Sequence, residues 1–183
     1  MGSSYNGTTD KTLTMHWNGH TWAAVATPSP GTSADVIGVR GTSSTDYWAV
    51  GDTVVGGVNQ TLALHWNGQR WARVTTPDPG GPTVGSSLVG VAATSATDAW
   101  AAGGTGPSTL ILHWNGSRWT HLRSPNLGAS NGLNAVAAAS ASNIWAVGQF
   151  NDGVNHTLAL HCCWTASSQR WRRHPHGYGH YQR

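Results

Sequence analysis

A repeat of about 48 residues limits what this chain can fold into. The segments at residues 12–22, 61–71 and 109–119 match almost residue for residue, and a fourth copy begins at residue 157. Their histidines follow one another at intervals of 49, 48 and 48 residues: His16, His65, His113 and His161. A second block, with the pattern Asp/Asn-x-Trp-Ala-x-Gly, alternates with the first at residues 46–51, 98–103 and 143–148. A fixed period of this length indicates one small structural unit that is stacked several times.

Each unit is predicted to contain four short β-strands. The first is rich in small residues, the second carries the tryptophan of the Asp/Asn-x-Trp block, and the third and fourth flank an Asn-Gly turn, which is the strongest local signal for a hairpin. A two-residue turn would pair Leu62 with Arg73. A three-residue turn, with Gly68 in the left-handed position, would pair Leu62 with Ala72. We favour the three-residue turn because it gathers four apolar side chains on one face: Leu62, Leu64, Ala72 and Val74.

The composition and the repeat together predict an all-β fold. Charged residues make up only 9% of the chain, so the charged faces of amphipathic helices cannot be built. Four antiparallel strands in every 40 to 50 residues are typical of a β-propeller blade. We predict a partial β-propeller of about three and a half four-stranded antiparallel blades, which forms an open arc. Because propellers typically close with about four to eight blades, we interpret the chain either as a fragment of a longer propeller or as an open arc of blades that must oligomerise to cover its edges.

The expected domain organisation follows from the repeat. Residues 1–160 are predicted to form the propeller repeats, with a half blade at 12–27, blades at 36–76 and 88–124, and the start of a blade at 133–160. Residues 161–183 are predicted to form a degenerate last hairpin and a basic His/Arg tail, because the HWNG pattern is lost there.

The repeat unit resembles a known class of propeller repeats. Its pattern, LxGVAATSxxDxWAVG followed by TLxLHWNGxxWxxVxxP, is similar to the Trp-rich tandem repeats, kelch-like or galactose-oxidase-like in architecture, of predicted secreted proteins of actinobacteria and related soil bacteria. This resemblance covers residues 5–160. The HWNGxxW portion, about ten residues in each unit, is also similar to the WDGxxW segment of bacterial propeller lectins. These resemblances imply an extracellular location for the parent protein and a carbohydrate ligand.

The charge distribution argues against a nucleic-acid partner. Residues 1–160 hold six Lys and Arg against seven Asp, whereas residues 161–183 hold four Arg and no acid, so the net charge of +3 comes from the tail. The body therefore lacks a basic stripe that could follow a phosphate backbone. The sequence contains no run of 18 apolar residues, so no membrane span is predicted. The N-terminus has no signal-peptide pattern. The adjacent Cys162 and Cys163 cannot form a disulfide framework.

The recurrent polar residues are assigned structural roles, and neither a catalytic residue, a metal site nor a cofactor is expected. Asp46 and Asp98 share a repeat position that Asn143 occupies in the third copy, so we interpret them as turn residues whose side chains accept backbone N–H bonds. The four recurrent histidines are expected to pack between blades and bond to backbone carbonyls. Equivalent positions on packed sheets lie ~10 Å apart, which is too far to share one metal ion. We therefore predict that the chain is not an enzyme.

The tryptophans are predicted to act mainly as wedges between blades, because each ring buries ~150–250 Å² and dominates core packing. This core set comprises Trp22, Trp48, Trp71, Trp100, Trp119 and Trp145. Three others lie beside the Asn-Gly turns and are the candidates for an exposed, ligand-binding role: Trp17, Trp66 and Trp114.

The connections that vary between repeats are expected on one face of the propeller, where rigid scaffolds usually build binding sites. They comprise residues 52–60, 75–87, 103–108, 124–132 and 149–156. We predict a non-catalytic binding or scaffold module that presents this face to a carbohydrate or protein partner. The alternative is a fragment of a larger propeller enzyme, an oxidase or a glycan-processing enzyme, whose catalytic groups lie outside this chain. Self-association through open blade edges is a further expectation.

Overall fold

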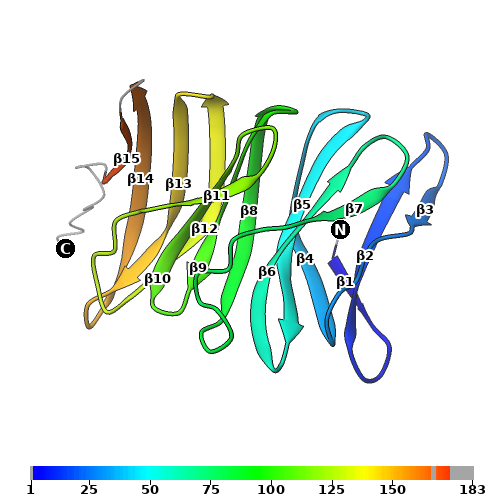
Figure 1. Cartoon of the computed structure of the whole chain (residues 1–183), viewed down its shortest axis with the longest axis horizontal. Coiled ribbons are helices and arrows are strands. Elements are labelled where there is room, and N and C mark those ends of the chain that lie inside the picture. The colour runs from blue at the N-terminus through cyan, green and yellow to red at the C-terminus, as the bar shows by residue number, and fades with distance from the viewer. Residues whose placement is uncertain (1, 166–167, 174–183) are drawn as a thin grey trace, which may run out of the picture.

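The computed structural model describes residues 2–165 and 168–173, with side chains described as far as Cys162. This part of the chain contains fifteen strands and no helix, arranged in four antiparallel sheets (Figure 1). The predicted all-β fold is confirmed. None of the described segments is a helix of the length and apolar character that crossing a membrane requires.

Each sheet corresponds to one blade. The first contains β1 (Gly2–Tyr5), β2 (Asp10–Trp17) and β3 (Trp22–Val25). The second contains β4 (Ser33–Ser43), β5 (Asp46–Val55), β6 (Val58–Trp66) and β7 (Trp71–Val74). The third contains β8 (Ser86–Ser95), β9 (Asp98–Thr105), β10 (Ser108–Trp114) and β11 (Trp119–Leu122). The fourth contains β12 (Ser130–Ser140), β13 (Asn143–Asn151), β14 (Asn155–Thr165) and β15 (Ser168–Arg173).

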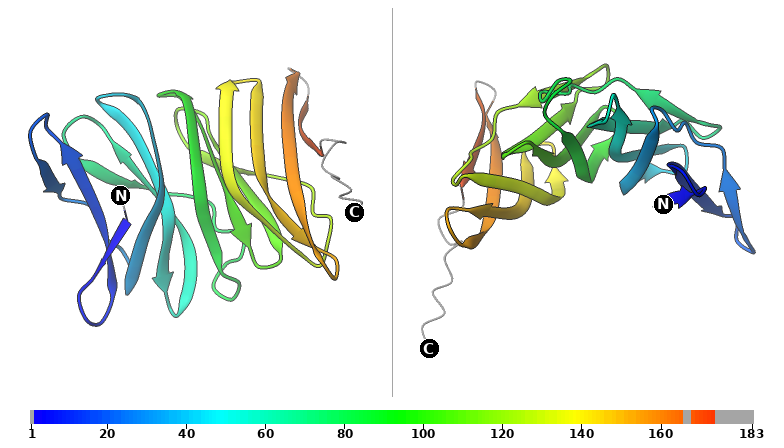
Figure 2. Two further views of the ribbon diagram at one scale, coloured as in Figure 1. Left: turned by 180° about the vertical axis from the view of Figure 1, so that it is seen from behind. Right: turned by 90° about the horizontal axis from the view of Figure 1, so that it is seen from below.

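The four blades stand side by side along an arc that does not close (Figure 2). The open arc of a partial propeller is therefore also confirmed. The first blade and the fourth blade form its two ends. The predicted boundary at residue 160 falls inside β14, and residues 174–183 of the predicted tail lie outside the described residues.

The first strands of neighbouring blades approach each other closely. A Cβ atom on Gly38 of β4 would lie 2.8 Å from the carbonyl oxygen of Val89 in β8. A Cβ atom on Gly90 of β8 would lie 3.0 Å from the Cα atom of Ala135 in β12. Small residues recur in the first strand of each repeat because larger ones would push these backbones apart.

A tryptophan from one blade is wedged against a tryptophan pair of the next. Trp48 of β5 is fully buried, and its ring centroid lies 4.9 Å from those of both Trp114 and Trp119 in the third blade. Trp100 is likewise buried between the third and fourth blades. These rings form the centre of the core between blades.

Not every tryptophan of the predicted core set is buried. Trp71 and Trp145 are half-buried, and Trp22 is 62% exposed, so the prediction was wrong for Trp22. The reason is the position of Trp22 in the first blade, at the end of the arc, where the described chain provides no preceding blade to cover it.

The Asn-Gly turns are longer than predicted. Trp66 pairs with Trp71, which leaves a loop of residues 67–70. The Asn67 Oδ1 atom accepts hydrogen bonds of 3.0 Å from the backbone N–H groups two and three residues further on, and Gly68 has a φ of +91°. The asparagine side chain therefore closes a four-residue loop, and the glycine provides its left-handed residue.

This loop changes the register of the hairpin. Leu64 pairs with Arg73, so the predicted pairing of Leu62 with Ala72 was wrong. Because side chains alternate along a strand, Ala72 and Val74 share a face with His65 instead of with the leucines. The predicted three-residue turn leaves no room for the hydrogen bonds that the Asn67 side chain accepts.

Candidate functional site

The second and third blades each contain a chain of three hydrogen-bonded side chains that ends on a buried tryptophan. In the second blade, the Asp46 carboxylate accepts a hydrogen bond from the Thr42 hydroxyl and lies 2.7 Å from His65 Nε2. The His65 ring packs 4.5 Å from the Trp48 ring, measured between centroids. The chain links three strands of one blade and holds the tryptophan wedge.

The third blade repeats this arrangement with Thr94, Asp98, His113 and Trp100. The His113–Asp98 contact is again 2.7 Å, and the His113 and Trp100 rings stack at 4.1 Å. In the fourth blade an asparagine replaces the aspartate, and His161 Nε2 lies 3.0 Å from its Oδ1 atom. His65, His113 and His161 thus each contact a side-chain oxygen through Nε2, a partner that the predicted bond to a backbone carbonyl did not include.

The same contacts correct the role assigned to Asp46 and Asp98. Their carboxylates bond to Thr and His side chains, so these residues connect strands and are more than turn formers. The sequence contained a signal for these contacts, because each Asp or Asn of the Asp/Asn-x-Trp block is followed by a histidine of the other repeated block. In a hydrolase triad the hydroxyl bonds to the histidine, which removes its proton. Here the hydroxyl bonds to the carboxylate, so the histidine cannot activate it as a nucleophile.

An aromatic pocket of about 500 Å³ lies between the first and second blades. Two of the three predicted ligand-binding residues, Trp17 and Trp66, line it, together with Trp22, Trp71 and Tyr47. Trp17 is 47% exposed, whereas Trp66 is half-buried and donates a hydrogen bond from Nε1 to the Ser44 carbonyl. His16, Met15 and four further side chains complete the wall: Thr14, Val25, Val39 and Ser44.

Trp114, the third predicted ligand-binding residue, is not part of this pocket. It lies at the next junction, where it is half-buried against Trp48 and donates a hydrogen bond to the Ala96 carbonyl. The structure therefore brings Trp17 and Trp66 together and separates both from Trp114.

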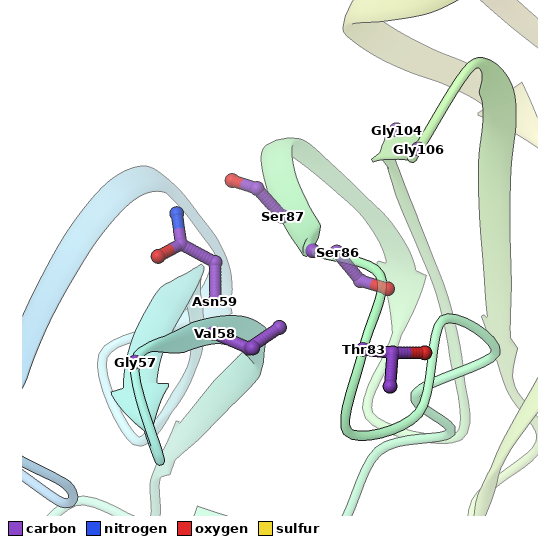
Figure 3. Close-up of a pocket in the computed structure, with 9 residues that line it drawn as sticks. Gly57, Val58, Asn59, Thr83, Ser86, Ser87, Gly104 and Gly106 are labelled. Carbon is purple, nitrogen blue, oxygen red and sulfur yellow. The ribbon is translucent and has the colours of Figure 1, made fainter.

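A second hollow lies at the opposite edge of the sheets, among the variable connections. It is a groove of about 550 Å³, and we call it the loop-face groove. The β5–β6 and β9–β10 connections and the approach to β8 form its walls, and Figure 3 shows Asn59 and Ser87 on opposite sides. Its other lining residues are Val58, Thr83 and Ser86 and the glycines 57, 85, 104 and 106. The described residues that line it carry no charged and no aromatic side chain.

A pair of carboxylates lies beside the loop-face groove. Asp35 and Asp52 are directly opposite each other in β4 and β5, and Ser87 Oγ donates a 2.6 Å hydrogen bond to Asp52. Burial raises the pKa of the Asp52 carboxyl, the Ser87 hydrogen bond partly offsets this rise, and the nearby Asp35 charge adds to it. Sequence reasoning missed this pair, because the other repeats have no carboxylates at these two positions.

Within the described residues, no three His, Cys or Asp side chains gather as a metal ion would require. Cys162 is buried in the core of the fourth blade, and the side chain of Cys163 lies outside the described part.

Comparison with known proteins places few limits on function. No protein-family model and no curated protein matches the sequence. Among solved structures, the fold is similar to one described as "YCF48 bound to D1 peptide", with a TM-score of 0.45 and 14% identity. The alignment covers 76% of this chain and 52% of the other, so the chain spans about half the length of that structure. So distant a likeness says nothing of what this chain binds.

Proposed function

We propose that the chain is a non-catalytic binding module whose loop-face groove takes a neutral carbohydrate. The observation that carries this proposal is the convergence of the variable connections on one groove lined by hydroxyl, amide and backbone groups. Such groups donate and accept hydrogen bonds without charge, which suits a polyhydroxylated ligand better than a phosphate or a carboxylate. We also propose that the repeats are of the kelch-like class and that the parent protein is extracellular.

The Thr–Asp–His chains support a structural role for the most conspicuous titratable groups. They lie inside blades, and their hydroxyls face carboxylates. The Asp35–Asp52 pair favours the alternative, a part of a glycan-processing enzyme, because glycoside hydrolysis uses two carboxylates, one with a raised pKa. Neither carboxylate lines the groove itself, so we place binding first.

A glycan array with the wild-type chain and two matched variants tests the proposal. Asn59 lines the groove, and Asn155 occupies the same repeat position in the fourth blade, away from the groove. We expect Asn59→Ala to weaken binding of the retained glycans by about fivefold or more, the effect of losing one hydrogen bond, and Asn155→Ala to leave it unchanged. Equal binding by both variants would place the ligand elsewhere. Release of reducing sugar that Asp52→Asn abolishes would favour the enzyme instead.

A further inference from the structure

The polar side chains that line the loop-face groove differ in what they can offer a ligand. Within the described chain, the Asn59 amide and the Thr83 hydroxyl take part in no hydrogen bond, so each can both donate and accept. Ser86 is buried and donates its hydroxyl hydrogen to Thr105 Oγ1. Ser87 is half-buried, and its side chain reaches from β8 toward the wall that carries Asn59 (Figure 3). The direction of the Ser87 hydroxyl therefore decides what this wall offers to a ligand.

The carboxylate of Asp52 fixes the direction of that hydroxyl. Ser87 Oγ lies 2.6 Å from Asp52 Oδ2 and donates its hydrogen to it. An ionised carboxylate accepts hydrogen bonds and donates none, so at neutral pH Ser87 cannot turn its hydrogen toward the groove. The lone pairs of Oγ remain for a ligand, and donation to a negative charge makes them stronger acceptors. Ser87 thus faces the groove as an acceptor alone.

The bond between Asp52 and Ser87 does not recur at the next junction. The strand registers place Gly104 of β9 at the repeat position of Asp52, and Gly132 of β12 at the repeat position of Ser87. Two glycines have no side chains that could form the bond. The Asp52–Ser87 pair is therefore not part of the packing that repeats from blade to blade, and it lies at the junction that holds the groove.

Asp52 occupies an unfavourable place for a charge. Burial raises the pKa of its carboxyl, the Ser87 hydrogen bond offsets part of this rise, and the Asp35 charge directly across in β4 adds to it. The residue opposite Asp52 on β6 is the uncharged Thr61, and β8 contains no titratable residue. None of these three strands places a cation opposite Asp52, so its ionised form lowers the stability of the fold. A charged group that is kept at such a cost is typical of a functional site.

We propose, on the basis of the sugar-binding role proposed above, that Asp52 is a positioning residue that sets the specificity of the loop-face groove. By holding the Ser87 hydrogen, Asp52 requires the ligand to present a hydrogen-bond donor to Ser87. A free sugar hydroxyl meets this requirement, whereas an ether oxygen or a fluorine only accepts and does not meet it. The groove therefore takes carbohydrates with an unsubstituted hydroxyl at this position and rejects those in which that hydroxyl is alkylated or replaced.

Deoxyfluoro sugars test this requirement, because fluorine in place of a hydroxyl can accept a hydrogen bond but cannot donate one. The first probes are the methyl glycosides of glucose, galactose and mannose, titrated up to about 50 mM into the ¹⁵N-labelled full chain near neutral pH. The 2-, 3-, 4- and 6-deoxyfluoro derivatives of the glycoside that binds most tightly follow. For the wild-type chain, we expect fluorine at one position to weaken binding by about five- to tenfold, because one hydrogen bond is lost and two acceptors then face each other.

Two variants separate the roles of the paired residues. In Asp52→Ala, the Ser87 hydroxyl can turn and donate to the fluorine, so the loss at that position should shrink to about twofold or less. In Ser87→Ala, the parent glycoside should bind about fivefold more weakly, and the fluorinated and parent sugars should bind equally. Asp152→Ala is the matched control, because it removes a carboxylate from another variable connection, outside the groove, and should preserve the full loss.

Three results would overturn the proposal. The first is a wild-type chain that tolerates fluorine at every position, and the second is a full fluorine loss that persists in Asp52→Ala, as a purely structural role would give. Both would leave the proposed function intact, because the parent sugar would still bind. The third is no binding of any of the three glycosides at about 50 mM. The proposed function fails as well only if the glycan array also detects no binding.

Discussion

The repeat provides a graded test of the tryptophan wedges, since one position occurs at three levels of burial. Trp119 is 4% exposed, Trp71 is half-buried and Trp22 is 62% exposed. Truncating a buried tryptophan to alanine costs about 3–5 kcal/mol. The buried Nε1 group of Trp119 has no hydrogen-bond acceptor among the described residues, and removing such a donor returns part of that cost. We therefore expect Trp119→Ala to lower the free energy of unfolding by about 3 kcal/mol, at the lower end of that range.

In the other two variants, the loss of unfolding free energy should be smaller the more exposed the tryptophan is. Trp22→Ala should change the free energy of unfolding by no more than about 0.5 kcal/mol, as surface substitutions do, and Trp71→Ala should fall between the two. In a chain of this size, about 3 kcal/mol corresponds to a melting temperature lower by about 6–12 °C. Urea and thermal unfolding of dilute protein measure the series. A loss for Trp22→Ala equal to that for Trp119→Ala would refute the argument from burial.

Three further predictions concern hydrogen bonds, pH and association. Asp98→Ala removes the acceptor of His113 Nε2 and should cost about 1–3 kcal/mol in chemical unfolding, whereas Asp98→Asn should cost less, because Asn143 already fills this role in the fourth blade. The pKa of Asp52 is raised in the folded chain, so ionisation of this carboxyl destabilises the fold as the pH rises above its ordinary pKa of 3.8. Asp52→Asn should therefore raise the melting temperature near neutral pH, and this gain should disappear below pH 3.8. Light scattering after size-exclusion chromatography should show heterogeneous association through the exposed end blades, and a uniform monomer would contradict this.

Much of the fold could be predicted because the repeat makes each strand visible several times. The tryptophan of the second strand, the small residues of the first strand and the Asn-Gly turns indicated fourteen of the fifteen described strands, all except β1. Nothing in the GSSY sequence of β1 resembles the second strands of the other blades, apart from the glycine. β1 pairs with β2 because the edge of β2 is available to it, and the local sequence of β1 does not indicate this pairing.

The candidate sites were less predictable, because they depend on side-chain partners and on missing neighbours. The hydrogen bond between Asp46 and His65 spans 19 residues, and only the recurrence of both residues in each repeat suggests it. The exposure of Trp22 and the aromatic pocket both arise where a blade ends the arc. A pattern that is identical in each copy assigns the same role to every equivalent tryptophan, although the copy at the end of the arc lacks a neighbouring blade.

The most direct test of the proposed function maps the ligand onto the chain by NMR. The best glycan from the array is titrated into ¹⁵N-labelled protein, and the backbone amide and tryptophan indole signals are followed. The proposal predicts shifts at residues that line the loop-face groove, above all Asn59, Ser87 and Gly104, with the indole signals unchanged. Shifts confined to the indoles of Trp17 and Trp66 would contradict it, because the sugar would then occupy the aromatic pocket.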